Sequence, residues 1–323
     1  MIQEIRIKNY LSFRDEVVLN FEATKDTTFE ECQVVNVTPT VRLLRFALIY
    51  GANASGKSNL LNAIDFLHGF WFNKKSDIDE ETGVIPFLLD TETPNEPSEF
   101  NVKFFVGDKR YWYALVLDNK QVIKENLYVY NSVQPSLVFS RELDGTVSLI
   151  KLNAGLVKAN ATIVEQLNVK CLSNMSFFAA RNQVNCSLAY IDDVRDWMKN
   201  NMMPIIEPGT RMFEYAGKQM EKNAELKAYI LDFVHKADYN ITDVYTEREK
   251  VPIPDFVKAS IMKDKDFPDK AKEKILADNI LERLRTDFQH TVKNKRGEEK
   301  YRLPNSLQSE GTKRTFGIEA AIY

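Results

Sequence analysis

Residues 51–58 have the composition of a phosphate-binding loop. They read Gly51-Ala52-Asn53-Ala54-Ser55-Gly56-Lys57-Ser58 and fit the pattern G-x-x-x-x-G-K-[ST]. Glycines let the backbone fold tightly, so that successive N–H groups point inward at phosphate oxygens. The ammonium group of Lys57 would reach the β- and γ-phosphates of a nucleotide, and the hydroxyl of Ser58 is a ligand for Mg²⁺. The segment therefore predicts a nucleotide phosphate site with Mg²⁺.

The residues around this loop have the pattern that such a site requires. Residues 43–50 (LLRFALIY) form an almost continuous apolar run, which predicts a strand buried on both faces. Apolar residues recur at helical spacing from 57 to 72, which predicts a helix directly after the loop. The alternative is a glycine-rich turn that matches by coincidence, with a chance on the order of 1% in average composition.

The remaining N-terminal half predicts an antiparallel sheet. Residues 2–22 alternate in polarity around a break at 11–15, which predicts two strands joined by a turn. Residues 73–98 are polar and rich in turn formers. Further strands are expected at 100–106, 110–117 and 122–130, and two more within 137–151.

Helical spacing appears in the C-terminal half. Leu226, Ile230 and Val234 lie on one face of an amphipathic helix. A second helix is expected from 269 to 284. The charge run at 263–274 mixes both signs, so it is interpreted as a solvated surface, with nucleic-acid binding as the alternative.

Composition excludes several classes of protein. The 323 residues are 44% hydrophobic and 28% charged, which is globular composition for one or two domains. The formal net charge of −3 gives no global basic surplus for nucleic acid, although a local basic face stays open. Three cysteines and three histidines are scattered, so neither a disulfide framework nor a zinc site is expected. Without an apolar leader or membrane span, a cytoplasmic location is predicted.

Two motifs near the N-terminus resemble those of a known ATPase group. The loop continues into Asn59 as GANASGKSN, and the chain opens with the residues of an I-x-I-x-N-[YF]-x-S-[FY] motif: Ile5, Ile7, Asn9, Tyr10, Ser12 and Phe13. Both motifs resemble the ABC-type ATPases of the SMC and RecF group. The resemblance implies ATP and Mg²⁺ as cofactors, with base and ribose contacts from Asn9, Ser12, Phe13 and Arg14. A plain turn between two strands is an equal alternative for those four residues.

A segment near the C-terminus resembles the ABC signature. Residues 306–314 read SLQSEGTKR, with Ser309 and Gly311 at the signature's serine and second glycine. The SEGTKR form resembles the ATP-binding proteins linked to abortive phage infection, the RloA-like and overcoming-lysogenization-defect relatives. The resemblance implies that this helix start covers the γ-phosphate bound to a second subunit. The alternative is that Ser309 only caps the last helix.

Two further site elements are less complete. The resemblance implies a glutamine that contacts Mg²⁺ and the attacking water, and Gln183 is the candidate, with a surface glutamine as the alternative. An Asp-Glu pair on a strand after the signature is also implied, but the sequence ends at Tyr323, within the signature helix. Asp90 and Asp192 follow strand-like runs upstream and are interpreted as structural. In another P-loop class, one of them would be the Mg²⁺ ligand.

The resemblance implies an α/β fold, a P-loop NTPase with an ABC-type head, an antiparallel β lobe and an inserted helical arm, whose C-terminal core strands are missing. The ATP-binding lobe is expected at 1–185 and the helical arm at 186–285. The return strand and signature helix are expected at 286–323. Strand 44–50 should then lose neighbours, and this polypeptide alone is expected to bind nucleotide poorly and to hydrolyse it at a negligible rate.

Three functions compete. The first is an ATPase whose dimer closes around ATP and controls an effector in phage defence or DNA repair. A second copy, a nuclease or other effector, and DNA are then the expected partners, with no membrane. The second is a non-hydrolysing module that uses ATP for dimerisation. The third is a GTPase-like switch or kinase, whose N/TKxD motif is not found in the sequence.

Overall fold

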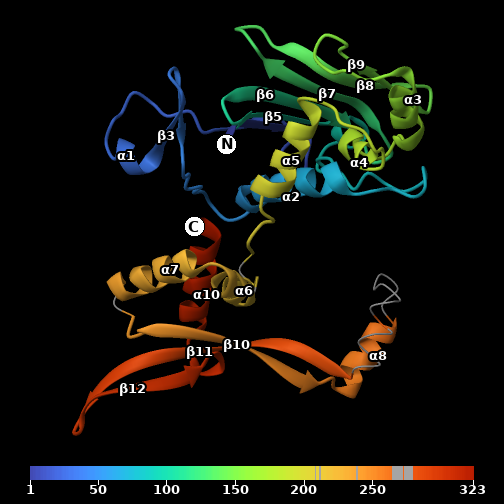
Figure 1. The fold of residues 1–323 in the computed structure, drawn as a ribbon. Helices are drawn as coiled ribbons and strands as arrows, with labels where there is room; N and C mark the ends of the chain where they lie inside the picture. The colour runs from blue at the N-terminus through green and yellow to red at the C-terminus, as the bar shows by residue number, and fades with distance from the viewer. Residues whose placement is uncertain (208, 211, 238, 264–271, 273–278) are drawn as a thin grey trace. The chain divides into compact units, whose positions relative to one another are not determined.

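A seven-stranded antiparallel sheet organises the first part of the chain (Figure 1). The computed structural model describes residues 1–207, 209–210, 212–237, 239–263, 272 and 279–323. The strands lie in the order β2-β1-β5-β6-β7-β8-β9. Their bounds are Ile2–Lys8 (β1), Val17–Asn20 (β2), Ser98–Val106 (β5), Lys109–Leu117 (β6), Val122–Tyr130 (β7), Ser136–Asp144 (β8) and Val147–Leu152 (β9). The strands predicted for 2–22, 100–130 and 137–151 are therefore confirmed.

Alternation of side chains explains this sheet. In β6, Tyr111, Tyr113 and Leu115 are fully buried, while the residues between them are only half-buried. Gly107 begins the turn between β5 and β6 with a φ of 61°, a conformation that glycine adopts without a steric cost. One face of the sheet therefore becomes the core and the other stays accessible.

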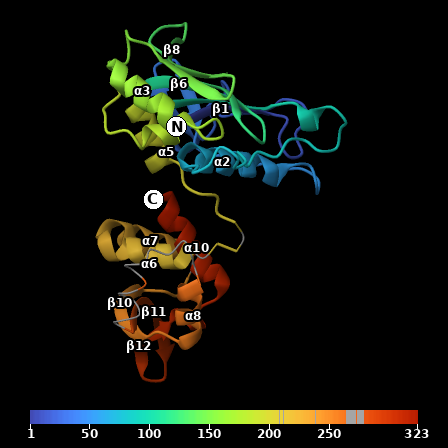
Figure 2. The ribbon, with the colours of Figure 1, turned by 90° about the vertical axis from the view of Figure 1, so that its right-hand side faces the viewer.

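Helices α2 (Lys57–Phe72), α4 (Phe177–Arg181) and α5 (Ile191–Asn201) cover the buried face, as Figures 1 and 2 show. Aromatic contacts join each helix to the sheet. The ring centroids are 5.6 Å apart for Trp71 and Tyr113, 4.0 Å for Phe139 and Phe177, and 4.6 Å for Phe104 and Trp197. Helix α3 (Ala161–Lys170) packs beside β9. The helix predicted at 57–72 is confirmed.

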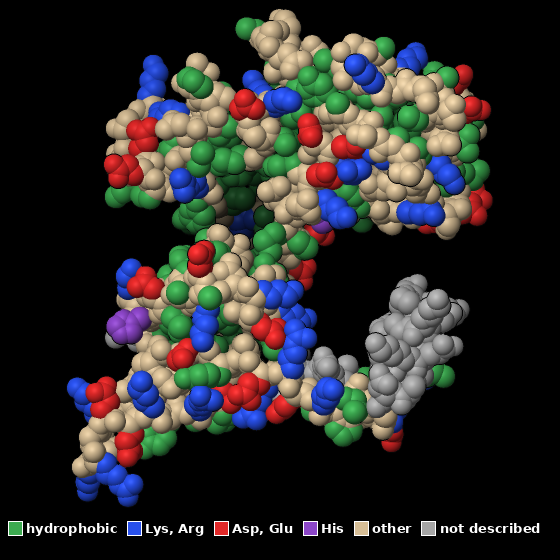
Figure 3. Space-filling view, in the orientation of Figure 1, with side chains coloured by type: hydrophobic (Ala, Val, Ile, Leu, Met, Phe, Trp, Pro, Cys, Tyr) green, Lys and Arg blue, Asp and Glu red, His purple; other side chains and the backbone are tan. Residues whose placement is uncertain are grey.

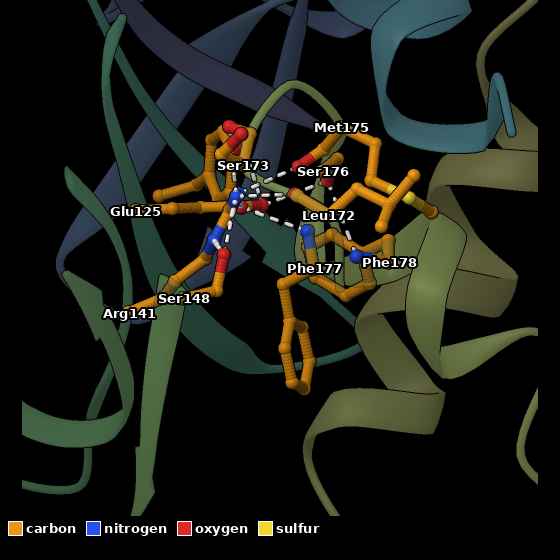
Figure 4. A network of polar contacts seen from close by, with 10 residues as sticks. Glu125, Arg141, Ser148, Leu172, Ser173, Met175, Ser176, Phe177 and Phe178 are labelled. Carbon is orange, nitrogen blue, oxygen red and sulfur yellow. Dashed lines mark hydrogen bonds and ion pairs between the residues drawn. The ribbon is translucent and has the colours of Figure 1, made fainter. Parts of the chain in front are cut away.

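The core of the sheet contains a fully buried ion pair (Figure 4). A guanidinium nitrogen of Arg141 lies 3.0 Å from Glu125 Oε2, and neither side chain is exposed to solvent. Glu125 also accepts hydrogen bonds from Tyr113, the Ser176 hydroxyl and the Phe177 N–H. The guanidinium donates further to Ser148 and to the carbonyls of residues 172, 173 and 175. These bonds fasten the segment before α4 to strands β7 and β8.

The strand predicted for 43–50 is wrong beyond its start. Strand β4 (Val41–Leu44) pairs with β3 (Val34–Thr38) beside the short helix α1 (Glu30–Gln33), and no strand includes residues 45–50. Phe46, Leu48 and Tyr50 are 66%, 61% and 81% exposed. A strand that is apolar on both faces needs other elements packed on each face and paired strands beside it. No strand among the described residues pairs with residues 45–50.

The chain divides into two compact units, Met1–Ile205 and Ile206–Tyr323. The second unit holds a three-stranded antiparallel sheet of β10 (Asp243–Pro252), β11 (Ile280–Asn294) and β12 (Gly297–Pro304). Its helices are α6 (Met212–Lys222), α7 (Ala224–Lys236), α8 (Asp255–Lys263) and α10 (Glu310–Ile322). Phe213, Phe288 and Phe316 form the centre of its core. The helix predicted at 226–234 is confirmed.

One expectation for this half is corrected. Residues 280–284 belong to strand β11, not to a helix, and 264–271 and 273–278 lie outside the described residues. The domain boundaries expected after 185 and after 285 stay predictions, beside a division of the chain into compact units after Ile205. Helix α5 packs on β5, and the ladder between β10 and β11 joins the expected arm to the expected return strand.

Positive and negative side chains are interspersed over the visible face in Figure 3. Every strand pair among the residues described is antiparallel. None of the described helices is both long and apolar enough to span a membrane.

Replacing Arg141 by Met should destabilise the first unit by about 3–5 kcal/mol, because Glu125 would be left buried without a counter-charge. All three tryptophans, Trp71, Trp112 and Trp197, lie in this unit, so their fluorescence during urea unfolding reports on it alone. Lys124→Met is the control, since the Lys124–Glu142 pair is exposed and should contribute less than about 1 kcal/mol. Equal midpoints for both variants would contradict the role given to the buried pair.

Candidate functional site

The loop at 51–58 ends at the start of helix α2. Residues 51–55 are exposed, and Gly56 precedes the helix in the left-handed region, with φ 88° and ψ 5°. No side chain caps the first turn. The first N–H groups of a helix have no partner within the helix, and the helix dipole adds positive potential there. The loop therefore presents main-chain donors at a helix N-terminus, which is an anion-binding arrangement.

The opening motif lies directly against this loop. A Cβ added at Gly56 would lie 2.7 Å from Ser12 Oγ and 2.9 Å from a ring carbon of Phe13. Asn59, in the first turn of α2, donates a hydrogen bond of 2.8 Å from Nδ2 to Ser12 Oγ. Two motifs that are far apart in the sequence therefore form one structure, and only glycine fits at position 56.

The side chain of Tyr10 also contacts helix α2. Its hydroxyl donates to the carbonyl of Asn62 at 3.2 Å, and its ring packs against Phe66 and Phe100 with centroids 5.7 and 5.2 Å apart. Burial raises the pKa of Tyr10 to about 12, so the hydroxyl remains a donor at neutral pH. No sequence pattern marks Asn62, one turn after Asn59, because its backbone rather than its side chain makes the contact.

Lys57 is folded over the loop. Its ammonium group donates to the carbonyl of Gly51 at 2.8 Å and to that of Ala52 at 2.6 Å. Both acceptors are neutral, whereas a phosphate oxygen would give a stronger, charge-assisted bond. The Lys57 ammonium group therefore lies beside the loop, where phosphate oxygens would replace its two carbonyl acceptors.

The loop fits a triphosphate with Mg²⁺. The exposed hydroxyl of Ser58 lies in the first turn of α2, one residue after Lys57. No group of three His, Cys, Asp or Glu side chains in the described segments is arranged to hold a metal. Mg²⁺ commonly takes few protein ligands and completes its shell with phosphates and water. Ser58 would be the protein ligand in an arrangement of this kind.

Asn9 does not fit the nucleotide role that the resemblance implies. Its side-chain amide donates to the carbonyls of Thr93 and Glu96, and its Oδ1 accepts from the N–H of Phe87. Asn9 is 1% exposed, so its polar atoms organise the 87–97 loop. Arg14 is exposed and pairs with Asp15 at 3.2 Å.

Gln183 lies just beyond the end of α4. Its side chain donates to the carbonyl of Ala179 at 3.4 Å. The surface hollow that it borders is formed by residues 181–187, Asp192 and Arg195, without any residue of the 51–58 loop. The structure therefore does not bring Gln183 together with Lys57 or Ser58.

The two upstream aspartates make different contacts. Asp192 accepts from the Arg181 guanidinium at 2.9 Å and from the N–H of Leu188 at 2.8 Å, so it organises the start of α5. Asp90 follows residues that form no strand and accepts from the N–H of Thr91. The structural interpretation of both residues agrees with these contacts.

Ser309 caps helix α10 in the second unit. Its Oγ accepts from the N–H of Thr312 at 3.0 Å. This bond agrees with the helix start predicted at Ser309 and with the alternative that Ser309 caps the last helix. Gly311 has no positive φ, and an added Cβ would lie 3.7 Å from Ser309 Oγ, which is ordinary contact distance. Space alone therefore does not require glycine at 311.

Comparison with known families supports the loop assignment. Residues 46–148 match a family described as "AAA domain, putative AbiEii toxin, Type IV TA system". The matched segment includes the whole phosphate loop and strands β5, β6, β7 and β8. It supports an AAA-type P-loop ATPase and a link to abortive infection. A search of curated proteins found no match.

Gly56→Ala should disrupt the loop. The left-handed conformation costs a non-glycine residue about 1–2 kcal/mol, and the new methyl group would displace Ser12 and Phe13. We expect a lower urea midpoint and loss of nucleotide binding, measured by tryptophan fluorescence and by titration with a fluorescent ATP analogue.

Gly69→Ala is the matched control in the same helix. A Cβ at Gly69 meets no atom within 4 Å, so this change should stabilise α2 by about 0.5–1 kcal/mol. If both variants bound the analogue like the wild type, the close fit at Gly56 would not matter for the site.

Proposed function

We propose that residues 51–58 bind ATP with Mg²⁺ and that this chain provides the nucleotide-binding part of a defence ATPase. One observation carries the proposal: Ser12 and Phe13 press against Gly56, leaving the uncapped N-terminus of α2 facing an exposed glycine-bounded loop. The family match over 46–148 supports the same reading.

Each residue of the loop has a distinct role in this proposal. The main-chain N–H groups from Gly51 to Ser58 donate to phosphate oxygens, and Lys57 leaves its two carbonyl partners for the β- and γ-phosphates. Ser58 would hold Mg²⁺, which would neutralise negative charge on the phosphate oxygens. Asn59 acts indirectly, because its bond to Ser12 fixes the first turn of the helix.

Hydrolysis, dimerisation and effector control extend the proposal. Gln183 is the candidate for contacting Mg²⁺ and the attacking water, and this role requires its loop to move from the bond to Ala179. Ser309 and Gly311 would cover the γ-phosphate bound to a second copy. The cytoplasmic effector would be a nuclease or another defence protein, with DNA as a target.

A second candidate function is an ATP-dependent dimerisation module without turnover. It is favoured by one observation: Asp192, one of the two upstream candidates for holding Mg²⁺, is bonded to Arg181. Measuring ATP-dependent mass and ATP turnover on the same sample separates the two functions. A dimer with turnover supports the ATPase, and a dimer without turnover supports the module.

Lys57→Ala should weaken binding of a fluorescent ATP analogue at least tenfold, since the loop would lose its only ammonium group. Lys120→Ala is the control, because Lys120 lies in an exposed turn between β6 and β7. Equal affinity of the Lys57→Ala variant and the wild type would refute nucleotide binding by this loop.

Ser309→Asp should abolish ATP-dependent dimerisation while leaving helix α10 intact. Aspartate caps a helix as well as serine does, but its charge would repel the γ-phosphate of the partner's nucleotide. Light scattering with and without Mg-ATP provides the mass, and Ser309→Thr, which keeps both cap and neutrality, is the control. A dimer that survives the aspartate would exclude this helix start from the interface.

A further inference from the structure

The accessible face of the large sheet carries a group of aromatic side chains. Trp112 on β6 and Tyr128 on β7 are paired in register, and their rings stack with centroids 4.6 Å apart and planes 18° apart. Tyr130 follows on β7, and the Arg110 guanidinium lies 4.5 Å from the centre of its ring. All four side chains are half-buried, so their faces and edges remain partly open to solvent.

A hollow of about 330 Å³ lies beside these rings. It is lined by Arg6 on β1, Asn101 and Lys103 on β5, Trp112 and Tyr130. The indole N–H of Trp112 donates to Asn101 Oδ1 at 3.0 Å, which fixes the orientation of the ring. A rigid aromatic wall with an amide and two cations at its edge has the chemistry to hold a planar base that carries a phosphate.

Two buried polar atoms on this face have no hydrogen-bond partner within the residues that the structure describes. They are Oδ1 of Asn126 and Nε of Arg110. Asn126 is 4% exposed, and its amide nitrogen donates to the hydroxyl of Tyr128. Neither residue lines the hollow and neither atom is open to solvent, so both belong to the packing that supports the rings and not to the surface that a ligand would touch.

On β1, β5 and β6, the charges of this face slightly favour an anion. The cations that these three strands carry on this face are Arg6, Lys8, Lys103 and Arg110. Glu4 pairs with Arg6 and Lys103, Glu16 with Arg6, and Glu99 with Lys8. Arg110 makes no ion pair with any side chain that the structure describes, so it is the cation in excess over three carboxylates. Stacking should therefore contribute more to binding than charge does.

We propose that this face binds single-stranded nucleic acid, with bases stacked on Trp112 and Tyr130 and phosphates beside Arg110, Lys103 and Arg6. Unpaired bases expose the faces that such rings recognise, whereas bases in a duplex are stacked on one another. The proposal goes beyond ATP binding and does not depend on it, because none of these residues belongs to the 51–58 loop.

Fluorescence anisotropy tests the proposal with the full chain and a labelled oligothymidine of about 20 nucleotides, a length that covers typical single-strand sites. The wild type should bind it, and Trp112→Ala/Tyr130→Ala should weaken binding at least tenfold. Tyr215→Ala, an exposed aromatic in the second unit, is the control and should bind like the wild type. Urea unfolding checks that each variant is folded, and single Trp112→Leu and Tyr130→Leu variants replace the double variant if it is not.

Several outcomes would overturn the proposal. They are no binding by the wild type, unchanged binding by the aromatic variants, equal binding of a duplex of the same length, or preferential binding of an acidic peptide. Lys57→Ala should bind the oligonucleotide normally. Loss of ATP binding with retained oligonucleotide binding, or the reverse, therefore tells the two sites apart.

Discussion

The arrangement of the first unit depends on the buried contact between Arg141 and Glu125. Removing two charges from water is costly, and the cost is offset only where almost every donor and acceptor finds a partner. Here the partners come from three separate pieces of chain: strands β7 and β8 with their neighbours, the 172–175 carbonyls, and the start of α4. The pair thus determines where the chain returns to the sheet after β9, and with it the position of α4 beside α2.

A second constraint acts at the loop itself. The turn after β1 supplies Tyr10, which bonds the backbone of α2, and Ser12 and Phe13, which lie against Gly56. Because β1 is hydrogen-bonded in the sheet between β2 and β5, the loop is supported by the same sheet that carries the buried pair. The anion-binding helix start is therefore held by packing, while its donors remain open to solvent.

The sequence pattern and the structure disagree at two segments. Residues 45–50 have the composition of a central strand, yet their side chains are exposed, since a strand requires hydrogen-bonding neighbours that composition cannot supply. Residues 280–284 show helical spacing but pair with β10, because a ladder that runs from Asp243 to Pro252 overrides local preference. Glu125 was overlooked, although its place on the inward side of a strand, with Leu127 and Val129, signals a buried charge in need of a partner.

The sequence by itself determined the phosphate loop, the helix after it and the strands of the antiparallel sheet, because these depend on local spacing of glycines and apolar residues. The contacts of Ser12 and Phe13 with Asn59 and Gly56 came from the tertiary structure. Only the tertiary structure decided that Asn9 serves the fold, that Gln183 bonds its own helix, and that Trp112 and Tyr130 share an accessible face. Those outcomes depend on which strands become neighbours, and long-range pairing is a property of the whole fold that residue order alone does not display.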